Sequence, residues 1–410
     1  IDGVLDDDVW RRAQVITDFI QSTPDEGQPA TERTEVRILF DGEMIYIAAF
    51  CFDRNPELIV ANVLRRDEPN DNGDSFVVTL DTFHDHRNGF YFETNPMGAR
   101  HDAQITGEMG SSMSARRGGE GFNRDWDAIW RAAAEINDEG WTAEIAIPLW
   151  SLRFRPEHSE VWGINFRRTV RRRSEESYWA PIPRQYNFTR LSLSGMMTGL
   201  QSIRASRNVQ ILPFVTGSAL QVPAPEVAPL AEDRASHDSS FDGDIGLDAK
   251  WGITPNMTLD MTLNTDFAQV EADDQQINLT RFSLFFPEKR EFFLENAGLF
   301  EFGTGSGVSR GGSVSMVGFH SRRIGISEKF GLVPLYGGGR LTGKMGPWSV
   351  GTLVMQSKAT DLLPSENYAV LRVTRDLAER SRVGMLITNR QSSGDVYNRA
   401  LGFDGRWALN

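Results

Sequence analysis

Apolar and polar residues alternate with a period of two along residues 241–263. One parity is apolar and the other charged: Phe241, Ile245, Leu247, Ala249 and Trp251 against Asp242, Asp244, Asp248 and Lys250. The alternation resumes after a short break, with Met257, Leu259, Met261 and Leu263 against Thr258, Asp260, Thr262 and Asn264. Successive side chains of a strand point to opposite faces of a sheet. The pattern therefore predicts a hairpin with one apolar face and one charged face.

Similar runs divide the chain into two all-β units. In residues 1–200, runs separated by Gly, Asn and Asp clusters predict an antiparallel sandwich with strands at 36–40, 44–52, 75–81, 89–94, 129–136, 142–148 and 161–170. After a bridge at 200–207, longer runs predict strands at 208–219, 241–253, 257–267, 313–326, 335–345, 348–358, 367–377, 382–390 and 398–409. Most of this second set have about the ten residues that a tilted membrane-spanning strand needs.

The second unit, residues 207–410, has the pattern of a transmembrane β-barrel. No segment approaches the roughly 18 to 20 apolar residues of a membrane-spanning helix, whereas two-faced hairpins suit a barrel with lipid outside and water inside. The predicted fold class is all-β: an N-terminal antiparallel β-sandwich followed by an antiparallel transmembrane β-barrel. The lumen wall would carry Asp242, Asp244, Asp248, Lys250 and Asp260.

The strand count leaves a difficulty. Bacterial barrels have even numbers of strands, whereas the candidates are odd in number, and the short turns at 252–256 and 346–347 fall at opposite ends of the predicted barrel. We therefore expect the barrel to be incomplete in this chain, with an extra crossing within 268–312.

The segment 268–312 is too long for an ordinary hairpin loop, and loops of that length are usually functional or folded in their own right. Its centre, residues 282–296, interleaves five phenylalanines with Glu288, Lys289, Arg290, Glu291 and Glu295. One hypothesis is that it folds into the lumen, with its charges facing the polar wall and its aromatic rings packing together. The alternative is a surface loop with a small aromatic core of its own.

The charge and the cysteine content restrict the partners. A net charge of −13 argues against a nucleic-acid partner, because phosphate binding needs a basic face. The basic run 167–173 is the exception, and its broken alternation favours a strand edge with solvated arginines. Cys51, the single cysteine, lies in an apolar run and is expected to be a buried, unpaired thiol. The chain opens without a leader, so we expect either a cytosolic protein or removal of a leader, and the barrel pattern favours removal.

Two short segments offer metal ligands. Residues 67–74 collect oxygen side chains, including Asp67, Asp71 and Asp74, and acidic loops of this kind can bind calcium, although the spacing does not match an EF-hand. A metal-free turn rich in Asp and Asn is the alternative. His84 and His86 suggest part of a zinc site, but no third ligand is evident, so a polar turn is the better interpretation.

Aromatic residues are frequent in the first unit, and exposed rings can stack on sugars. Most of its tryptophans lie within or beside strand runs and are expected in the core. Trp126, between two aspartates, and Trp179, beside Tyr178, are the candidates for a ligand-binding surface. The sequence contains no nucleophile elbow, phosphate loop or HExxH motif, and no carboxylate pair at a defined separation. We therefore expect a protein that is not an enzyme.

Several stretches resemble known families. The opening residues 1–10, together with 30–41, 74–81, 140–148 and 162–165, resemble family-9-type carbohydrate-binding modules in order and spacing. Further along, the stretches 285–295, 321–325 and 339–344 resemble signature stretches of a bacterial family in which such a module is fused to an uncharacterised outer-membrane barrel. The resemblance covers nearly the whole chain.

The resemblance implies a β-sandwich module followed by a barrel that, in family members, extends beyond the end of this chain. Such modules bind sugar ends between tryptophans, assisted by polar side chains and structural calcium. The sequence departs from this pattern where the sugar-binding forms carry a clamp tryptophan, since residues 71–73 are Asp-Asn-Gly. Val77 stands where a carboxylate is expected, and Glu93 where an arginine is expected. The resemblance thus implies the fold more strongly than it implies sugar binding.

These observations predict a non-enzymatic outer-membrane protein that recognises or handles a glycan or a related solute at the cell envelope. Outer-membrane lipid is the expected partner, calcium is the one cofactor considered, and the order of the units favours a periplasmic sandwich. An alternative is a structural or docking protein of an outer-membrane assembly whose sandwich has lost sugar binding and contacts envelope proteins. A glycan hydrolase is a third reading, based only on analogy with enzymes that carry such modules.

Overall fold

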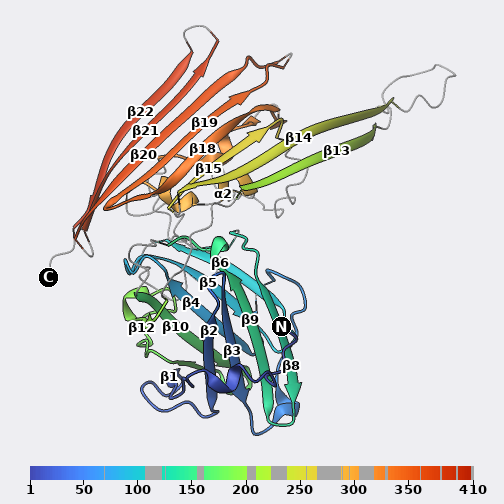
Figure 1. Cartoon of the computed structure of the whole chain (residues 1–410). Helices are drawn as coiled ribbons and strands as arrows, with labels where there is room; N and C mark the ends of the chain where they lie inside the picture. The colour runs from blue at the N-terminus through green and yellow to red at the C-terminus, as the bar shows by residue number, and fades with distance from the viewer. Residues whose placement is uncertain are drawn as a thin grey trace.

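The fold is described from a computed structural model. It describes residues 1–410 except 69, 107–121, 125, 155–160, 201–208, 223–237, 255, 266–287, 289, 295, 304–317, 328–330, 361, 379–380, 394–395 and 408–410. All the extended sheets are antiparallel (Figure 1). None of the described helices has the length and apolar character that a membrane-spanning helix requires.

The first unit consists of two sheets. The smaller sheet has the order β2-β3-β9-β8, with β2 (Thr34–Phe40), β3 (Met44–Phe52), β9 (Gly140–Pro148) and β8 (Arg131–Asn137). The larger has the order β1-β11-β10-β4-β5-β6-β7, and β12 also pairs with β10. Its strands are β1 (Ile20–Thr23), β11 (Glu175–Tyr178), β10 (Val161–Val170), β4 (Ser75–Asp81), β5 (Asn88–Thr94), β6 (Arg100–Thr106), β7 (Phe122–Asn123) and β12 (Gly195–Thr198).

One core joins these sheets face to face. Alternate side chains of each sheet fill it, for example Ile45 and Ile47 from β3 against Phe90 and Phe92 from β5, all almost fully buried. Inward and outward side chains alternate because the strand repeat is two residues. The sandwich predicted from the sequence is therefore present, with the predicted strands at nearly the predicted positions.

The basic run 167–173 does not form a solvated strand edge. Its strand, β10, lies inside the larger sheet between β4 and β11. Arg168 is completely buried and donates hydrogen bonds to the carbonyl oxygens of Arg33 and Phe52. The expectation of solvated arginines is therefore wrong for Arg167 and Arg168, which are buried in the sheet, whereas Arg171 and Arg173 after the strand are exposed.

The second unit is an eight-stranded antiparallel sheet in sequence order (Figure 1). Its strands are β13 (Val209–Val222), β14 (Asp238–Thr254), β15 (Met257–Leu263), β18 (Leu335–Met345), β19 (Trp348–Ser357), β20 (Glu366–Ala378), β21 (Ser381–Ser392) and β22 (Tyr397–Arg406). Among the described residues no pairing joins β13 to β22, so the sheet is open.

The predicted strand at 313–326 is wrong in its described part. Residues 321–323 form the short 3-10 helix η8 (Ser321–Arg323), and only β16 (Ile326–Ser327) follows, paired with β17 (Gly331–Leu332) outside the large sheet. Without this strand, the number of predicted strands in the second unit becomes even and equals the eight strands of the sheet. The absence of this strand also brings the short β14–β15 and β18–β19 turns to the same end of the sheet, so no extra crossing is needed to explain them.

Candidate functional site

A polar pocket opens on the outer face of the larger sandwich sheet, away from the core. Strand alternation produces it: Phe90 and Phe92 of β5 point into the core, so Tyr91 and Glu93 point outward. Its empty space is about 570 Å³, counted to its open mouth. The pocket is lined by Asn70, Asp71, Ser75, Tyr91, Glu93, His101, Phe122, Arg124, Arg167, Thr169, Arg171, Glu176 and Phe188.

Three hydrogen-bonding side chains form the floor of this pocket. The Tyr91 hydroxyl donates to Glu93 Oε2 at 2.8 Å and accepts from Arg167 Nη2 at 3.3 Å. Arg167 Nη2 also lies 3.6 Å from Glu93 Oε1. Burial raises the pKa of Tyr91 well above its ordinary value, and the nearby Glu93 carboxylate adds to the rise. The phenol is therefore a stable donor held in place by a charged pair.

Aromatic rings form one wall of the pocket. Tyr91, Phe122 and Phe188 pack around one another with ring centroids 4.8 to 5.4 Å apart. The Arg167 guanidinium lies over the Phe188 ring, 4.8 Å from its centroid. These three rings are only 2%, 3% and 8% exposed, so the wall is a tightly packed apolar backing for the donors and the acceptor of the pocket.

Trp126, predicted to be a surface ring, lies in the core. Only 8% of it is exposed, and its ring packs on Phe90 at 5.0 Å. The flanking Asp127 does not draw the segment into solvent, because Arg66 pairs with it. The same arginine contacts the buried Asp102, which accepts a hydrogen bond from the backbone of Ala128. The surface placement expected from the neighbouring aspartates is therefore wrong.

Tyr178 is buried and Trp179 is partly buried. Trp179 packs on Phe166 at 5.9 Å, and its ring lies over Gly195 of β12, where a Cβ atom would come within 2.3 Å of it. Tyr178 is buried in the apolar cluster that includes Val77 and Phe188. Neither residue lines the pocket described above.

The three aspartates predicted to bind calcium border this pocket at different points. Asp71 is on its lining, Asp67 lies 3.6 Å from Nδ1 of the lining residue His101, and Asp74 accepts a hydrogen bond from the backbone of Arg171. Among the described residues, these three do not form a group with ligand atoms within 4.8 Å of one another. Calcium binding here remains a prediction.

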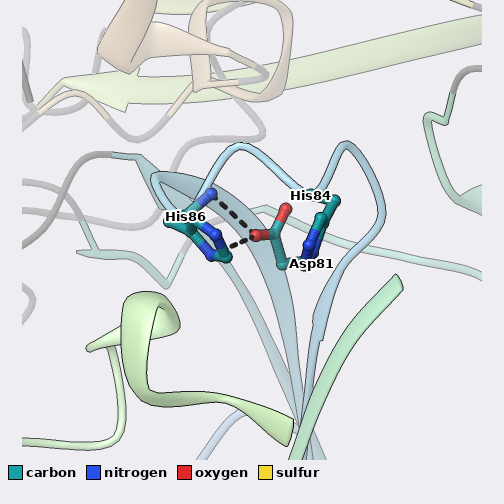
Figure 2. A group of neighbouring side chains, drawn as sticks. All are labelled: Asp81, His84 and His86. Atoms are coloured by element: carbon teal, nitrogen blue, oxygen red, sulfur yellow. Dashed lines mark hydrogen bonds and ion pairs between the residues drawn. The ribbon is translucent and has the colours of Figure 1, made fainter. Parts of the chain in front are cut away.

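A different group does converge. Oxygen and nitrogen ligand atoms of Asp81, His84 and His86 all lie within 4.8 Å of one another at the turn between β4 and β5. Figure 2 shows Asp81 beside the two imidazole rings, whose centroids are 4.7 Å apart, and its Oδ2 is 3.6 Å from His86 Nδ1. Burial, with the neighbouring carboxylate of Asp85, raises the pKa of Asp81 to about 7, and burial lowers the pKa of His84.

On the second sheet, three of the residues predicted to line the lumen share one pocket. Asp248, Lys250 and Asp260 line it together with Arg340 and Phe292. Arg340 of β18 donates to Asp260 of β15, its cross-strand neighbour, at 2.9 Å. Asp244 is exposed further along β14, where it accepts a hydrogen bond from Asn264. The side chain of Asp242 lies outside the described residues.

The Phe-rich segment, the described residues between 288 and 303, packs on the face of the sheet that carries Asp248 and Asp260. It contains α2 (Glu291–Leu294) and the 3-10 helix η7 (Ala297–Phe300). Phe293 and Phe300 are buried against Leu353 and Val370 of the sheet. Gly351 leaves room for the Phe300 ring, since a Cβ atom there would lie 3.1 Å from it. The packing agrees with the first hypothesis, in which the segment covers the charged face.

That hypothesis expected the charges to face the polar wall, but the two that the structure describes, Glu288 and Arg290, pair locally instead. Glu288 accepts a 2.6 Å hydrogen bond from Arg290, and Arg290 also donates to the backbone carbonyls of Ser321 and Ile324. Arg290 is only 5% exposed and lies over Phe293. These contacts within residues 288–324 provide hydrogen-bond partners for Glu288 and Arg290 without the sheet. Lys289 and the side chain of Glu291 lie outside the described residues.

The same segment also contacts the sandwich. Asn296 accepts a hydrogen bond from Gln104 of β6 and donates one to Thr342 of β18. Figure 1 shows the segment around α2 between the two units. Beside it, the β4–β5 turn makes direct ion pairs with the sheet: Asp85 with Lys344 at 2.7 Å, and Arg87 with Asp376 at 2.6 Å.

Sequence reasoning missed most of the residues that the structure gathers into sites. Tyr91, Phe122, Phe188 and Arg167 were not proposed as ligand contacts. Tyr91 could have been found, because alternation places it opposite two core phenylalanines. Asp81 could not have been found as the partner of the two histidines, since nothing in the local pattern makes its side chain turn toward them.

Comparison with known proteins gives few matches. A family model described as a domain of unknown function (DUF5916) matches residues 220–328, which include β15 and the Phe-rich segment. A similar solved structure is that of a Bacteroides uniformis protein to which carbohydrate binding is provisionally assigned. It is 12% identical with a TM-score of 0.34, and the alignment covers 46% of this chain and 87% of that chain. No curated protein sequence matches the chain.

Proposed function

We propose that the second sheet is part of an outer-membrane β-barrel whose apolar face contacts lipid. The observation that carries the proposal is an inverted burial pattern. On β15, Met261 and Leu263 are 40% and 58% exposed, while Asp260 and Thr262 are buried. On β22, Phe403 is 71% exposed beside Asp404, which pairs with Arg372. A sheet in water would bury its apolar side chains and expose its charges.

The exposed apolar face extends across the strands of the sheet. The register places the exposed apolar residues side by side on one face, since Val215 is paired with Ile245 and Ile387 with Leu401. Large exposed apolar residues on this face include Val209, Ile211, Val215, Ile245, Trp251, Met261, Leu263, Met345, Trp348, Val354, Val383, Ile387, Leu401 and Phe403. An apolar face of this extent on an isolated protein marks a partner or a membrane.

The position of the sandwich supports a periplasmic location for it. Its contacts with the sheet, at Lys344 and Asp376, lie next to the short β18–β19 and β20–β21 connections. Outer-membrane barrels have short turns on the periplasmic side and longer loops outside. The sandwich therefore docks at the periplasmic end.

Labelling of adjacent residues tests the membrane contact. Ile387 and Thr388 are adjacent on β21, so their side chains point to opposite faces of the sheet. In the variants Ile387→Cys and Thr388→Cys, the new thiol would be labelled with a fluorophore in the full chain reconstituted into phosphatidylcholine vesicles. We expect nitroxide-labelled lipid chains to quench the label at 387 strongly and that at 388 weakly. Equal quenching at both positions, or quenching at 387 only by a water-soluble agent, would contradict the proposal.

We further propose that the sandwich pocket recognises a small polyhydroxylated solute, such as the end of a glycan, without chemical conversion. Arg167 and Glu93 offer a donor and an acceptor for hydroxyl groups, and the packed aromatic rings behind them form an apolar backing for the pocket. The resemblance of residues 1–200 to carbohydrate-binding modules supports the same ligand class.

A matched pair of variants tests this recognition. Tyr91→Phe and Tyr46→Phe each remove a hydroxyl that donates to a carboxylate, but only Tyr91 lines the pocket. Calorimetric titration of the full chain with mono- and disaccharides should give saturable binding. Tyr91→Phe should weaken it about tenfold, because a hydrogen bond to a charged group contributes about 1.5 kcal/mol. Tyr46→Phe should bind as the unaltered chain does. Absence of binding to every sugar would reject recognition.

A second candidate function is that the sandwich is only a docking domain that closes the periplasmic end of the barrel. The observation that favours it is that Trp126 is buried and Trp179 is partly buried against the core, so the two rings do not form an open platform. If no sugar binds while the labelling experiment succeeds, this alternative replaces recognition.

A further inference from the structure

We propose that Asp81, His84 and His86 form a binding site for a divalent transition metal ion of the Zn²⁺ class. Two imidazole nitrogens and one carboxylate oxygen converge at the β4–β5 turn, with their ligand atoms within 4.8 Å of one another. Zinc prefers nitrogen and carboxylate ligands, and sites with three protein ligands leave a fourth position for water.

One ring nitrogen of each histidine lacks a hydrogen-bond partner. Nδ1 of His84 and Nδ1 of His86 are both buried from solvent and make no hydrogen bond in the described structure. Buried polar atoms are normally paired. A metal ion between these nitrogens and Asp81 would satisfy all three groups together.

The backbone holds both histidines in an uncommon conformation. His84 and His86 have φ values of 48° and 59°, in the left-handed region that residues with a side chain seldom occupy. Asp81 accepts hydrogen bonds from the backbone amides of Asp85 and His86, which close the turn around its carboxylate. The turn thus brings the two rings into edge-to-face contact, with centroids 4.7 Å apart, beside one carboxylate (Figure 2), at the cost of local strain.

The neighbouring carboxylate does not belong to the site. Asp85 pairs with Lys344 of the second sheet and accepts hydrogen bonds from the amides of Arg87 and Asn88. Because Asp85 and Arg87 carry the ion pairs between the two units, an ion at Asp81, His84 and His86 would fix the turn that docks the sandwich. This role is independent of whether the sandwich binds a sugar.

Zinc titration of the chelator-treated full chain tests the site. We expect one Zn²⁺ per chain by calorimetry and metal analysis. His84→Gln and His86→Gln should each weaken binding by about tenfold or more, since even changes to outer-shell partners have effects of that size. His320→Gln, a histidine of the second unit outside this group, should bind zinc as the unaltered chain does. Unchanged affinity in both site variants would overturn the proposal.

A measurement on the unaltered chain keeps the proposal testable if a variant does not fold. X-ray absorption of the zinc-loaded chain should show imidazole scattering from two histidines, with zinc-to-ligand distances of about 2.0 to 2.2 Å. No stoichiometric zinc uptake, or a spectrum without imidazole scattering, would overturn the site.

Discussion

At the scale of single residues, the sandwich core contains a charged group that links its two sheets. Arg168 of β10 donates to the carbonyl oxygens of Arg33 and Phe52 at the edge of the facing sheet. Burying a guanidinium is costly unless its donors are satisfied, so these bonds fix how β10 crosses β2 and β3. Cys51, which pairs with Thr34 across the β2–β3 ladder, lies in the same enclosed region.

Cys51 should be chemically inert in the folded chain. Burial raises the pKa of its thiol to about 12, and the positive charge of Arg168 offsets only part of that rise. At pH 8, only about one thiol in ten thousand would be ionised, and the thiolate is the reactive form. We expect no reaction with a thiol reagent at pH 8 in the native chain and full reaction in denaturant.

The pH dependence of this thiol has a defined sign. A raised pKa means that the neutral thiol favours the folded state below the unfolded pKa, and that this contribution is lost as the pH rises through about 12. A thiol introduced on the exposed surface of the sandwich by Glu139→Cys is the control and should react at pH 8 without denaturant. Rapid native labelling of Cys51 would show that the core opens.

At the scale of elements, glycines on the sheet accommodate the rings of the Phe-rich segment. Gly351 of β19 faces Phe300, and Gly402 of β22 faces Phe302. Arg372 lies over the Phe302 ring while it pairs with Asp404. The segment is thus held by packing of its rings over glycines and by a cation–π contact. Its packing on the sheet does not depend on Glu288 and Arg290.

Adding one methyl group should disturb this packing. In Gly402→Ala the new Cβ would lie 2.5 Å from Phe302 Cζ, whereas in Gly405→Ala on the same strand the nearest atom is 3.5 Å away. Overpacking of this kind costs about 1 to 3 kcal/mol. Thermal unfolding in detergent should occur at a lower temperature for Gly402→Ala than for Gly405→Ala. Equal midpoints would mean that Phe302 does not pack there.

At the scale of the whole molecule, the two units are joined by charges at one end of the sheet. Lys344 lies between Asp85 of the sandwich and Asp376 of β20, at 2.7 and 3.0 Å, and Arg87 contacts the same Asp376. These groups are mostly shielded from solvent, so the attraction between them is screened less than in a surface pair.

Removing the central lysine should loosen the docking. In Lys344→Met, two carboxylates lose their shared cation, and the turn that Asp85 anchors should open more often. With a chelator present, hydrogen exchange at the amides of Arg87 and Asn88 should quicken by about tenfold, which corresponds to about 1.4 kcal/mol of opening free energy. Lys358→Met, whose lysine contacts Asn264 instead, is the control. Equal exchange rates in the two variants would argue that the ion pairs of Lys344 do not hold the two units together.

The sequence by itself determined the elements that depend on local geometry. Apolar runs between turn signals predicted β3 and β5 almost residue by residue. Period-two alternation predicted β14 and β15, with errors of three to four residues at one end of each, because side-chain direction in a strand follows from the backbone repeat. It also predicted two all-β units and the pairing of an apolar face with a charged one. The strand at 313–326 failed because a short apolar run is compatible with several conformations.

The tertiary structure alone decided which side chains meet. Asp81 turns toward His84 and His86, Arg66 removes the need for solvent around Trp126, and Phe300 finds the space above Gly351. Each of these contacts depends on strand register and on packing between segments far apart in the chain. Local patterns carry no information about such distances, so the pocket and the metal-ligating group became visible only once the strands were placed side by side.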